Sequence, residues 1–255
     1  MNEMLQEHNA LTTPGGQNAR ELWIAMIGDM VASRKLPPEQ RRTTQERFAQ
    51  LMRELNEEFA SAIAGRFAIT QGDEFECLLQ PEVATEQLAE IIWRIEERFP
   101  SPAIRFGIGL GGIDTDIPNP PEPAILLDGP AFHRAREAVV FAAREKCMGG
   151  VFLGFGEAHD AILNGLARLL ERQRRRWSGR QREVARMLHS GMKQVEIARS
   201  TVRTPQAVSI DTRAAGWPAY VEGEKALRAA LREALRSNSV DPVPREDRAG
   251  NQDLG

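Results

Sequence analysis

The sequence predicts an α+β protein whose C-terminal part is all helical. Two observations lead to this class. Up to about residue 157, short apolar runs of strand length alternate with stretches whose apolar residues recur every three or four positions, and beyond it only the helical spacing continues. Residues 1–160 carry 15 Lys and Arg against 25 Asp and Glu, a net charge of −10, whereas residues 161–255 carry 18 against 11, a net charge of +7. An acidic mixed domain followed by a basic helical domain is expected.

The first six elements follow the order strand, helix, strand, strand, helix, strand. Pro37 and Pro38 begin the first helix, and Pro100 and Pro102 end the second. This order is that of a ferredoxin-like βαββαβ domain. The strands are expected at 22–28, 66–70, 74–80, 104–109 and 151–153, and the helices at 38–64, 82–98, 130–144, 157–177, 178–190, 193–200, 204–215 and 219–236.

These patterns divide the chain into five parts: a disordered N-terminus (1–19), the mixed domain (20–156), a linker helix (157–177), the helical domain (178–236) and a disordered tail (237–255). There is no run of 18 apolar residues, which predicts no membrane span, and no apolar segment of a secretory signal. The two cysteines, Cys77 and Cys147, lack metal-ligand spacing. A cytoplasmic protein is expected.

Acidic side chains stand at two places that the βαββαβ order brings together. Asp29 follows the first apolar strand, and Asp73 and Glu74 lie in the turn before the third. A right-handed crossover makes the first two strands parallel, so the third returns antiparallel beside the first and the carboxylates share one sheet edge. Carboxylates this close suit Mg²⁺ or Mn²⁺. The alternative is that Asp29 caps a helix and Asp73 makes an Asx turn.

The loop after Asp29 suits a phosphate group. Ser33 offers a hydroxyl, Arg34 and Lys35 offer positive charge, and the helix start offers backbone N–H groups. Glycine-rich sequence around Arg105 is compatible with a phosphate contact, although such glycines more often allow close packing of a strand. The further candidate nucleotide contacts are Arg105, His133 and Arg136, the last two with a solvated helix face as the alternative.

Four segments in this order resemble the SatD family of bacterial proteins over about 20–145: Ile27–Arg34, Thr70–Phe75, Arg105–Gly109 and Asp128–Glu137. More distantly, the same segments resemble the palm domain of class III nucleotidyl cyclases, and the turn at 72–75 resembles the signature of GGDEF-type diguanylate cyclases. That resemblance implies that Asp29 and Asp73 hold two metal ions on a nucleoside triphosphate.

The sequence departs from the cyclase pattern where catalysis would need a cation. His133 and Glu137 stand where class III cyclases carry Asn and Arg, and Gln71 replaces the first glycine of the GGDEF turn. No catalytic residue is therefore assigned, and binding of a nucleotide is favoured over cyclase turnover.

The basic C-terminal part contains a candidate DNA-binding motif. Arginine occupies six of the eleven positions 172–182, and the sequence over about 178–217 resembles the helix-turn-helix of LuxR- and sigma-type regulators, with Ala198 at the helix crossing and Ile197 and Val208 inward. Val202 stands where the turn usually has Gly. Contacts with bases or phosphates are expected from Arg175, Arg180, Arg203, Thr204, Gln206, Ser209 and Arg213.

Three functions follow. The first is a DNA-binding transcription regulator with a metal- and nucleotide-binding palm-like domain; the second is a nucleotidyl cyclase-like enzyme using two divalent metal ions; the third is a protein-interaction scaffold with a degenerate palm domain. Operator sites are usually read by dimers, so a homodimer through the helix at 157–177 or the helix at 219–236 is a candidate assembly. Trp177 and Trp217 bracket the candidate DNA-binding motif and are interpreted as core residues.

Overall fold

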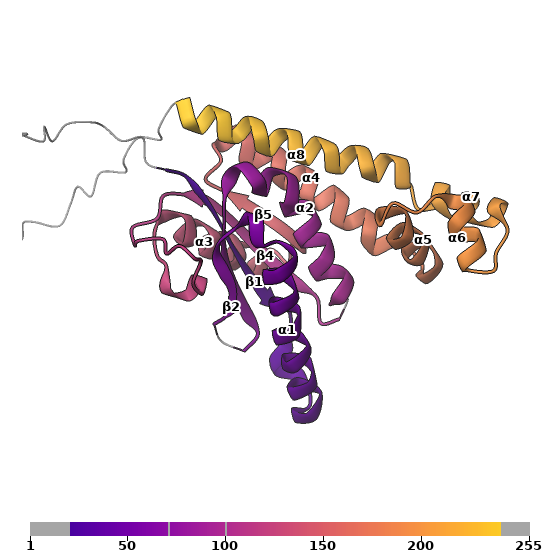
Figure 1. Ribbon diagram of the computed structural model, residues 1–255, viewed down its shortest axis with the longest axis horizontal. Helices are drawn as coiled ribbons and strands as arrows, with labels where there is room; N and C mark the ends of the chain where they lie inside the picture. Colours follow the sequence, from indigo (N-terminus) through magenta and orange to yellow (C-terminus); the bar gives the residue numbers. More distant parts are fainter. Residues whose placement is uncertain (1–20, 71, 100, 241–255) are drawn as a thin grey trace, which may run out of the picture.

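A computed structural model describes residues 21–70, 72–99 and 101–240, and within these residues the fold is α+β, with one five-stranded sheet and eight α-helices (Figure 1). The strands are β1 (Trp23–Met30), β2 (Ile63–Ile69), β3 (Glu74–Leu79), β4 (Ile104–Gly111) and β5 (Gly149–Leu153). The helices are α1 (Pro38–Glu58), α2 (Pro81–Arg98), α3 (Pro130–Arg144), α4 (Glu157–Arg176), α5 (Gly179–His189), α6 (Gln194–Ser200), α7 (Pro205–Ala214) and α8 (Trp217–Val240).

The sheet has the strand order β2-β3-β1-β4-β5. Strand β1 is central and antiparallel to both β3 and β4, and β5 runs parallel to β4. The register places Asp29, near the end of β1, directly opposite Glu74 of β3 on one side and Arg105 of β4 on the other. Because directly paired residues point to the same face of a sheet, these three side chains form one row.

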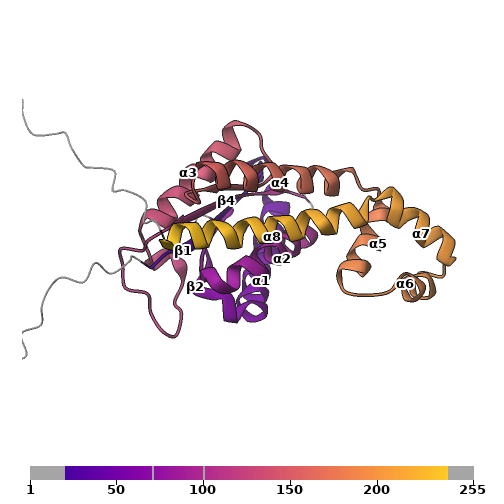
Figure 2. The ribbon, with the colours of Figure 1, turned by 90° about the horizontal axis from the view of Figure 1, so that it is seen from above.

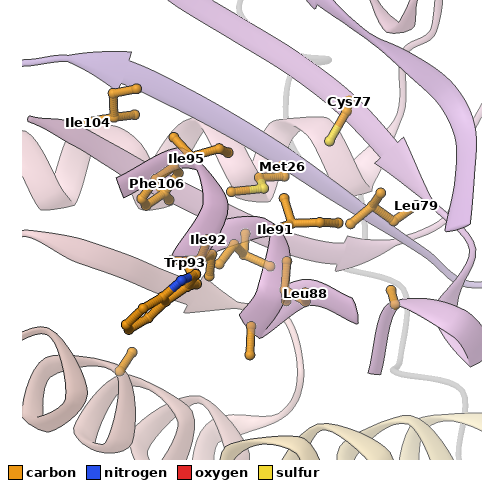
Figure 3. Packing of buried hydrophobic residues seen from close by; sticks show 14 of the residues in the cluster. Met26, Cys77, Leu79, Leu88, Ile91, Ile92, Trp93, Ile95, Ile104 and Phe106 are labelled. Carbon is orange, nitrogen blue, oxygen red and sulfur yellow. The ribbon is translucent and has the colours of Figure 1, made fainter. Parts of the chain in front are cut away.

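Each face of the sheet is covered by helices because alternate strand residues are apolar on both sides. On one face, Met26 and Cys77 pack against α1 and α2, and the close view in Figure 3 shows Met26 beside Ile91 of α2. On the other face, Ile27 and its neighbours pack against α3. Helices α4 and α8 extend the first layer and run alongside each other (Figure 2).

Helix α3 lies unusually close to β4 because the strand presents glycines to it. A Cβ atom added to Gly107 would lie 2.0 Å from the carbonyl oxygen of Ala135, and one added to Gly109 would lie 2.2 Å from that of Ala131. These glycines therefore serve close packing of backbone on backbone.

On each outer strand of the sheet, an asparagine side chain bonds the backbone of one residue. The amide of Asn56 accepts from Phe67 N (2.8 Å) and donates to Phe67 O (3.0 Å) on β2. The amide of Asn164 makes the same pair of bonds with Phe152 on β5, at 2.8 and 2.9 Å. Each asparagine satisfies backbone groups that would otherwise invite pairing with another chain.

The main boundary error of the sequence prediction concerns the first crossover. Helix α1 ends at Glu58 rather than at Ala64, and a short 3-10 turn leads into β2 at Ile63 instead of 66. Asn56, in the last turn of α1, bonds Phe67 and so holds β2 against the end of the helix. Helix α8 continues to Val240, so the first residues of the predicted tail are helical. The predictions of disorder for 1–19 and for the rest of the tail lie outside the described residues.

Helices α5, α6 and α7 form a small unit at one end of the molecule (Figure 1). They share a core of four buried residues, Val184, Ile197, Ala198 and Val208. Helix α5 begins with a capping box in which Ser178 and Gln181 satisfy each other's backbone N–H groups. Helix α8 then returns from this unit to the sheet domain, where its buried residues join the main core.

We predict that replacing Val202 by glycine stabilises the protein by about 1 kcal/mol. Val202 has φ of 53°, a left-handed conformation that costs a β-branched residue about 1–2 kcal/mol and glycine almost nothing. Its side chain is 94% exposed, so no packing is lost. Urea unfolding measures the effect. The same change at Val195, an exposed position inside α6, should destabilise instead, because glycine weakens a helix.

Candidate functional site

A row of charged side chains crosses the sheet near the end of β1. Asp29 Oδ2 accepts a hydrogen bond of 2.6 Å from Arg105 Nη2, and both side chains are partly buried. Burial raises the pKa of Asp29, Arg105 opposes this, and the charges of Asp73 and Glu74 raise the pKa further. The acids of the two predicted positions therefore lie close enough to interact.

Asp73 faces a different neighbour from Glu74. Its carboxylate accepts a hydrogen bond from the hydroxyl of Ser33, and its carbonyl oxygen accepts from Met30 N at 2.9 Å. Gly72 has φ of 78°, and a side chain there would meet Gln45. The turn is thus fixed against both the loop after β1 and the first turns of α1.

Ser33 and Asp73 line a small cavity of about 160 Å³ together with residues of α1 and of the two loops. This volume is below the range usual for sites that enclose a whole small molecule, so the cavity can enclose a phosphate group or a hydrated cation, and the rest of a nucleotide would lie outside it. The other lining residues are Met30, Leu36, Arg41, Thr44, Gln45 and Gly72.

The predicted phosphate loop is a separate turn before α1. Ser33–Lys35 forms a 3-10 turn that follows Ala32 in the left-handed conformation (φ 58°), whereas α1 begins only at Pro38. Ser33 is buried and Lys35 is exposed. The backbone of this turn contains Arg34, whose side chain lies outside the described part of the structure.

Arg136 of α3 reaches the same row as Asp29. Its guanidinium makes two hydrogen bonds with the carboxylate of Glu74 and a third, of 2.5 Å, with Glu76 Oε1. Glu76 was not singled out from the sequence, although its place two residues after Glu74 puts it on the same face. Burial raises the pKa of Glu76 against the effect of Arg136.

The other candidate contact on α3, His133, has its partner outside this row. His133 contacts Asp128 at 3.1 Å, and both side chains are exposed. Arg134, its neighbour, donates to the carbonyl oxygen of Leu110 at 2.6 Å and so has a structural role. Of the candidate nucleotide contacts, Arg105 and Arg136 are therefore the two whose bonds tie them to the acidic row.

A metal ion held by Asp29, Asp73 and Glu74 together does not fit this arrangement. Among residues 21–70, 72–99 and 101–240, no group of three or more His, Cys, Asp and Glu side chains is placed to hold a metal ion. Both oxygens of Glu74 are bonded to Arg136. The divalent metal stays a prediction, for which Asp29 and Asp73 are the two candidate carboxylates.

A larger cavity lies at the opposite end of the sheet and was not anticipated from the sequence. Its volume is about 710 Å³, and Trp23, Gln80 and the loop at 112–119 line it. Prolines at positions 118, 120, 121 and 123 interrupt this loop and the segment after it, and no periodic pattern there would have indicated a cavity.

The predicted DNA contacts are distributed over α7 and the segments before it. Gln206 and Arg213 are exposed on α7, and Ser209 is half-buried between them. Thr204 caps α7 by accepting from Ala207 N at 3.2 Å while remaining exposed. Arg203 forms an ion pair with Asp211 and Arg175 one with Glu171, whereas Arg180 is exposed.

The arginine-rich segment is not a uniform surface. Arg174 is mostly buried, forming an ion pair of 2.5 Å with Glu96 of α2 and donating to the hydroxyl of Tyr220 on α8 at 2.7 Å. Trp177 is buried and donates to the carbonyl oxygen of Ala215 at 2.7 Å. Arg174 therefore holds the end of α4 against α2 and α8, and Trp177 holds the segment after α4 against the end of α7.

His189, the last residue of α5, joins the α5–α7 unit to α2. Its ring stacks on Trp93 of α2, with the ring centres 4.2 Å apart. Its Nε2 lies 3.3 Å from a carboxylate oxygen of Glu90 and 3.9 Å from one of Glu224. Burial, supported by nearby guanidinium groups, lowers the pKa of His189 to about 4. Those guanidinium groups belong to Arg228, Arg94 and Arg174.

We predict that His189 makes the protein less stable as the pH falls from about 6.5 to about 4. Its pKa in the folded protein lies below its ordinary value of 6.5, so the fold favours the neutral ring and loses this contribution when protons bind. His189→Phe should reduce the acid loss by about 2 kcal/mol, a value lowered for partial exposure. Unfolding curves across this pH range measure it, with His133→Phe, at an exposed histidine, as the comparison for the effect of the substitution itself.

A protein-family model matches most of the chain. The SatD family model matches residues 23–212, about three-quarters of the sequence, and so includes the sheet domain, α4 and the three short helices almost to the end of α7. No curated protein matches the chain. None of the described helices is long and apolar enough to cross a membrane. The protein belongs to the SatD family.

Proposed function

We propose that this protein is a DNA-binding regulator in which α5–α7 form a helix-turn-helix and the sheet domain binds a phosphate-bearing ligand. The observation that carries the DNA-binding part is the surface of α7. Val208 and Thr212 hold this helix on the unit's core, while Gln206 and Arg213 remain exposed to reach a base edge or a phosphate.

The charge of the unit supports a polyanionic partner. Residues 178–216 carry seven Lys and Arg against three Asp and Glu. Arg180 and Arg199 are exposed there, and Arg172 and Arg176 are exposed at the end of α4 beside it. Each phosphate that such groups neutralise adds affinity that falls with salt.

A mobility-shift series with DNA from the protein's own promoter region tests this part. Gln206→Ala and Arg213→Ala should each weaken binding by about 1–3 kcal/mol, or roughly 5- to 150-fold. Arg236→Ala, an equally exposed arginine on α8, should leave binding unchanged. Absence of binding at low salt, or equal binding by all variants, would refute the proposal.

A phosphate-bearing ligand of the sheet domain is supported by the row at the end of β1. The order β2-β3-β1-β4 agrees with the βαββαβ palm domain, and it brings Asp29, Asp73 and two arginines to one edge. Mg²⁺ is commonly held by one or two carboxylates together with substrate phosphates and water. Asp29 and Asp73 would hold such an ion, and Arg105 would compensate a phosphate charge.

Thermal shift with nucleoside triphosphates, with and without Mg²⁺, tests the ligand. Asp29→Asn and Asp73→Asn should abolish a Mg²⁺-dependent rise in melting temperature, whereas Asp116→Asn, an exposed carboxylate at the other end of the sheet, should retain it. No shift with any triphosphate would contradict this part alone. Release of pyrophosphate in the same mixtures would favour the cyclase-like enzyme instead.

A further inference from the structure

The outer side of α4 carries an apolar stripe, which runs beside the exposed Arg168. Leu163, Ala167 and Leu170 are buried against the sheet domain. On the opposite side, spacings of four, three and four residues align Ala158, Ile162, Gly165 and Leu169, and all four are exposed. Ile162 is 50% exposed and Leu169 67%. A stripe with this spacing is the form that pairs with a second helix.

Charge along α4 indicates how the second helix would run. Its first turn contains the exposed carboxylate of Glu157, and its last two turns contain the exposed Arg172 and Arg176. A parallel copy would bring equal charges together, whereas an antiparallel copy would place the acidic end of each helix beside the basic end of the other. The middle of the stripe falls at Gly165, where an added Cβ would meet nothing within 4 Å.

We propose that two copies of this chain associate through the outer faces of α4, antiparallel, about a twofold axis near Gly165. A twofold interface needs a self-complementary surface, which the apolar stripe and the opposed charged ends provide. Helix α8 does not offer one. Its exposed side chains are mostly charged or small, as Glu222, Lys225, Arg232 and Arg236 illustrate.

The antiparallel α4 dimer would also set the distance between its two α5–α7 units, and the meaning of that distance rests on the proposed DNA binding. Arg176, where α4 ends before the α5–α7 unit, is eleven residues from Gly165, or about 16 Å at 1.5 Å per residue. The two α4 ends would thus be about 33 Å apart, near the spacing of half-sites one turn apart on DNA. The α5–α7 units lie beyond these ends (Figure 1). The two units would therefore be separated by at least one turn of DNA.

Charge reversal tests the pairing without DNA. Glu157 and Arg172 are fifteen residues apart on one helix, about 22 Å, and cannot contact each other within one copy. Sedimentation equilibrium should show a dimer for the natural sequence, at least 10-fold weaker association for Glu157→Arg and for Arg172→Glu, and recovery in the double variant. A monomer at every concentration, or no recovery in the double variant, would overturn the antiparallel α4 dimer.

Cysteine cross-linking locates the axis. Gly165→Cys, made with Cys147→Ser, should form a covalent dimer under mild oxidation because the two thiols meet at the axis. Ala226→Cys, an exposed alanine on α8, should stay monomeric in the same background. Cross-linking of Ala226→Cys alone would assign the interface to α8 and overturn the proposal. A dimer without DNA binding would instead leave the interface intact and refute only the regulator function.

Discussion

Replacement of Gly109 by alanine is expected to destabilise the protein by about 3 kcal/mol, which is at the upper end of the usual cost of overpacking. The added methyl group would lie 2.2 Å from the carbonyl oxygen of Ala131 and 2.4 Å from the backbone nitrogen of Ala135. Neither is the end of a flexible side chain, so α3 must move away from β4. Urea unfolding measures the loss.

The same substitution should disturb the row of charges as well as the core. Helix α3 carries Arg136, whose guanidinium bonds Glu74 and Glu76 only while the helix keeps its place. A matched control is Gly179→Ala in the first turn of α5, where an added Cβ would meet nothing within 4 Å. That variant should stay within about 0.5 kcal/mol of the natural protein. Equal stability of the two alanine variants would contradict the backbone clash.

The sheet domain was predictable because its signals are local. Each apolar run and each proline or glycine that ends it marks an element, so the α+β class and most element positions follow from periodicity alone. The ionic partners were not predictable in the same way. Arg136 stands near Glu74 only because α3 crosses β4 at its glycines, and nothing in the spacing of 62 residues between them signals that contact.

The arginine-rich segment is a second case in which tertiary contacts could not be predicted from the sequence. A run of arginines predicts a solvated or DNA-facing surface, since each position looks alike in sequence. In the folded chain Arg174 turns inward to Glu96, while Arg172 and Arg176 remain exposed. Which arginine is buried depends on where α2 and α8 cross α4, and this is a property of tertiary packing.

Removal of the Arg174 side chain is expected to have a large effect on the packing of α4 against α2 and α8. Arg174→Ala would leave the mostly buried carboxylate of Glu96, 22% exposed, without its partner, which should cost about 3 kcal/mol, the lower end of the range for fully buried pairs. Arg175→Ala removes an arginine that is 54% exposed and should cost less than about 1 kcal/mol. Thermal and urea unfolding at neutral pH compare the two.

The pH dependence of the variant distinguishes a lost ion pair from lost packing. Burial already raises the pKa of Glu96, and Arg174 opposes that rise. Without the arginine the pKa rises further, so the variant should regain stability as the pH falls and Glu96 takes up a proton. Glu96→Gln in the Arg174→Ala background should restore stability at neutral pH, because it removes the unpaired charge. If neither acid nor Glu96→Gln restores stability, the loss comes from the contacts of Arg174 with Tyr220, and the ion pair is not what holds α4 against α2.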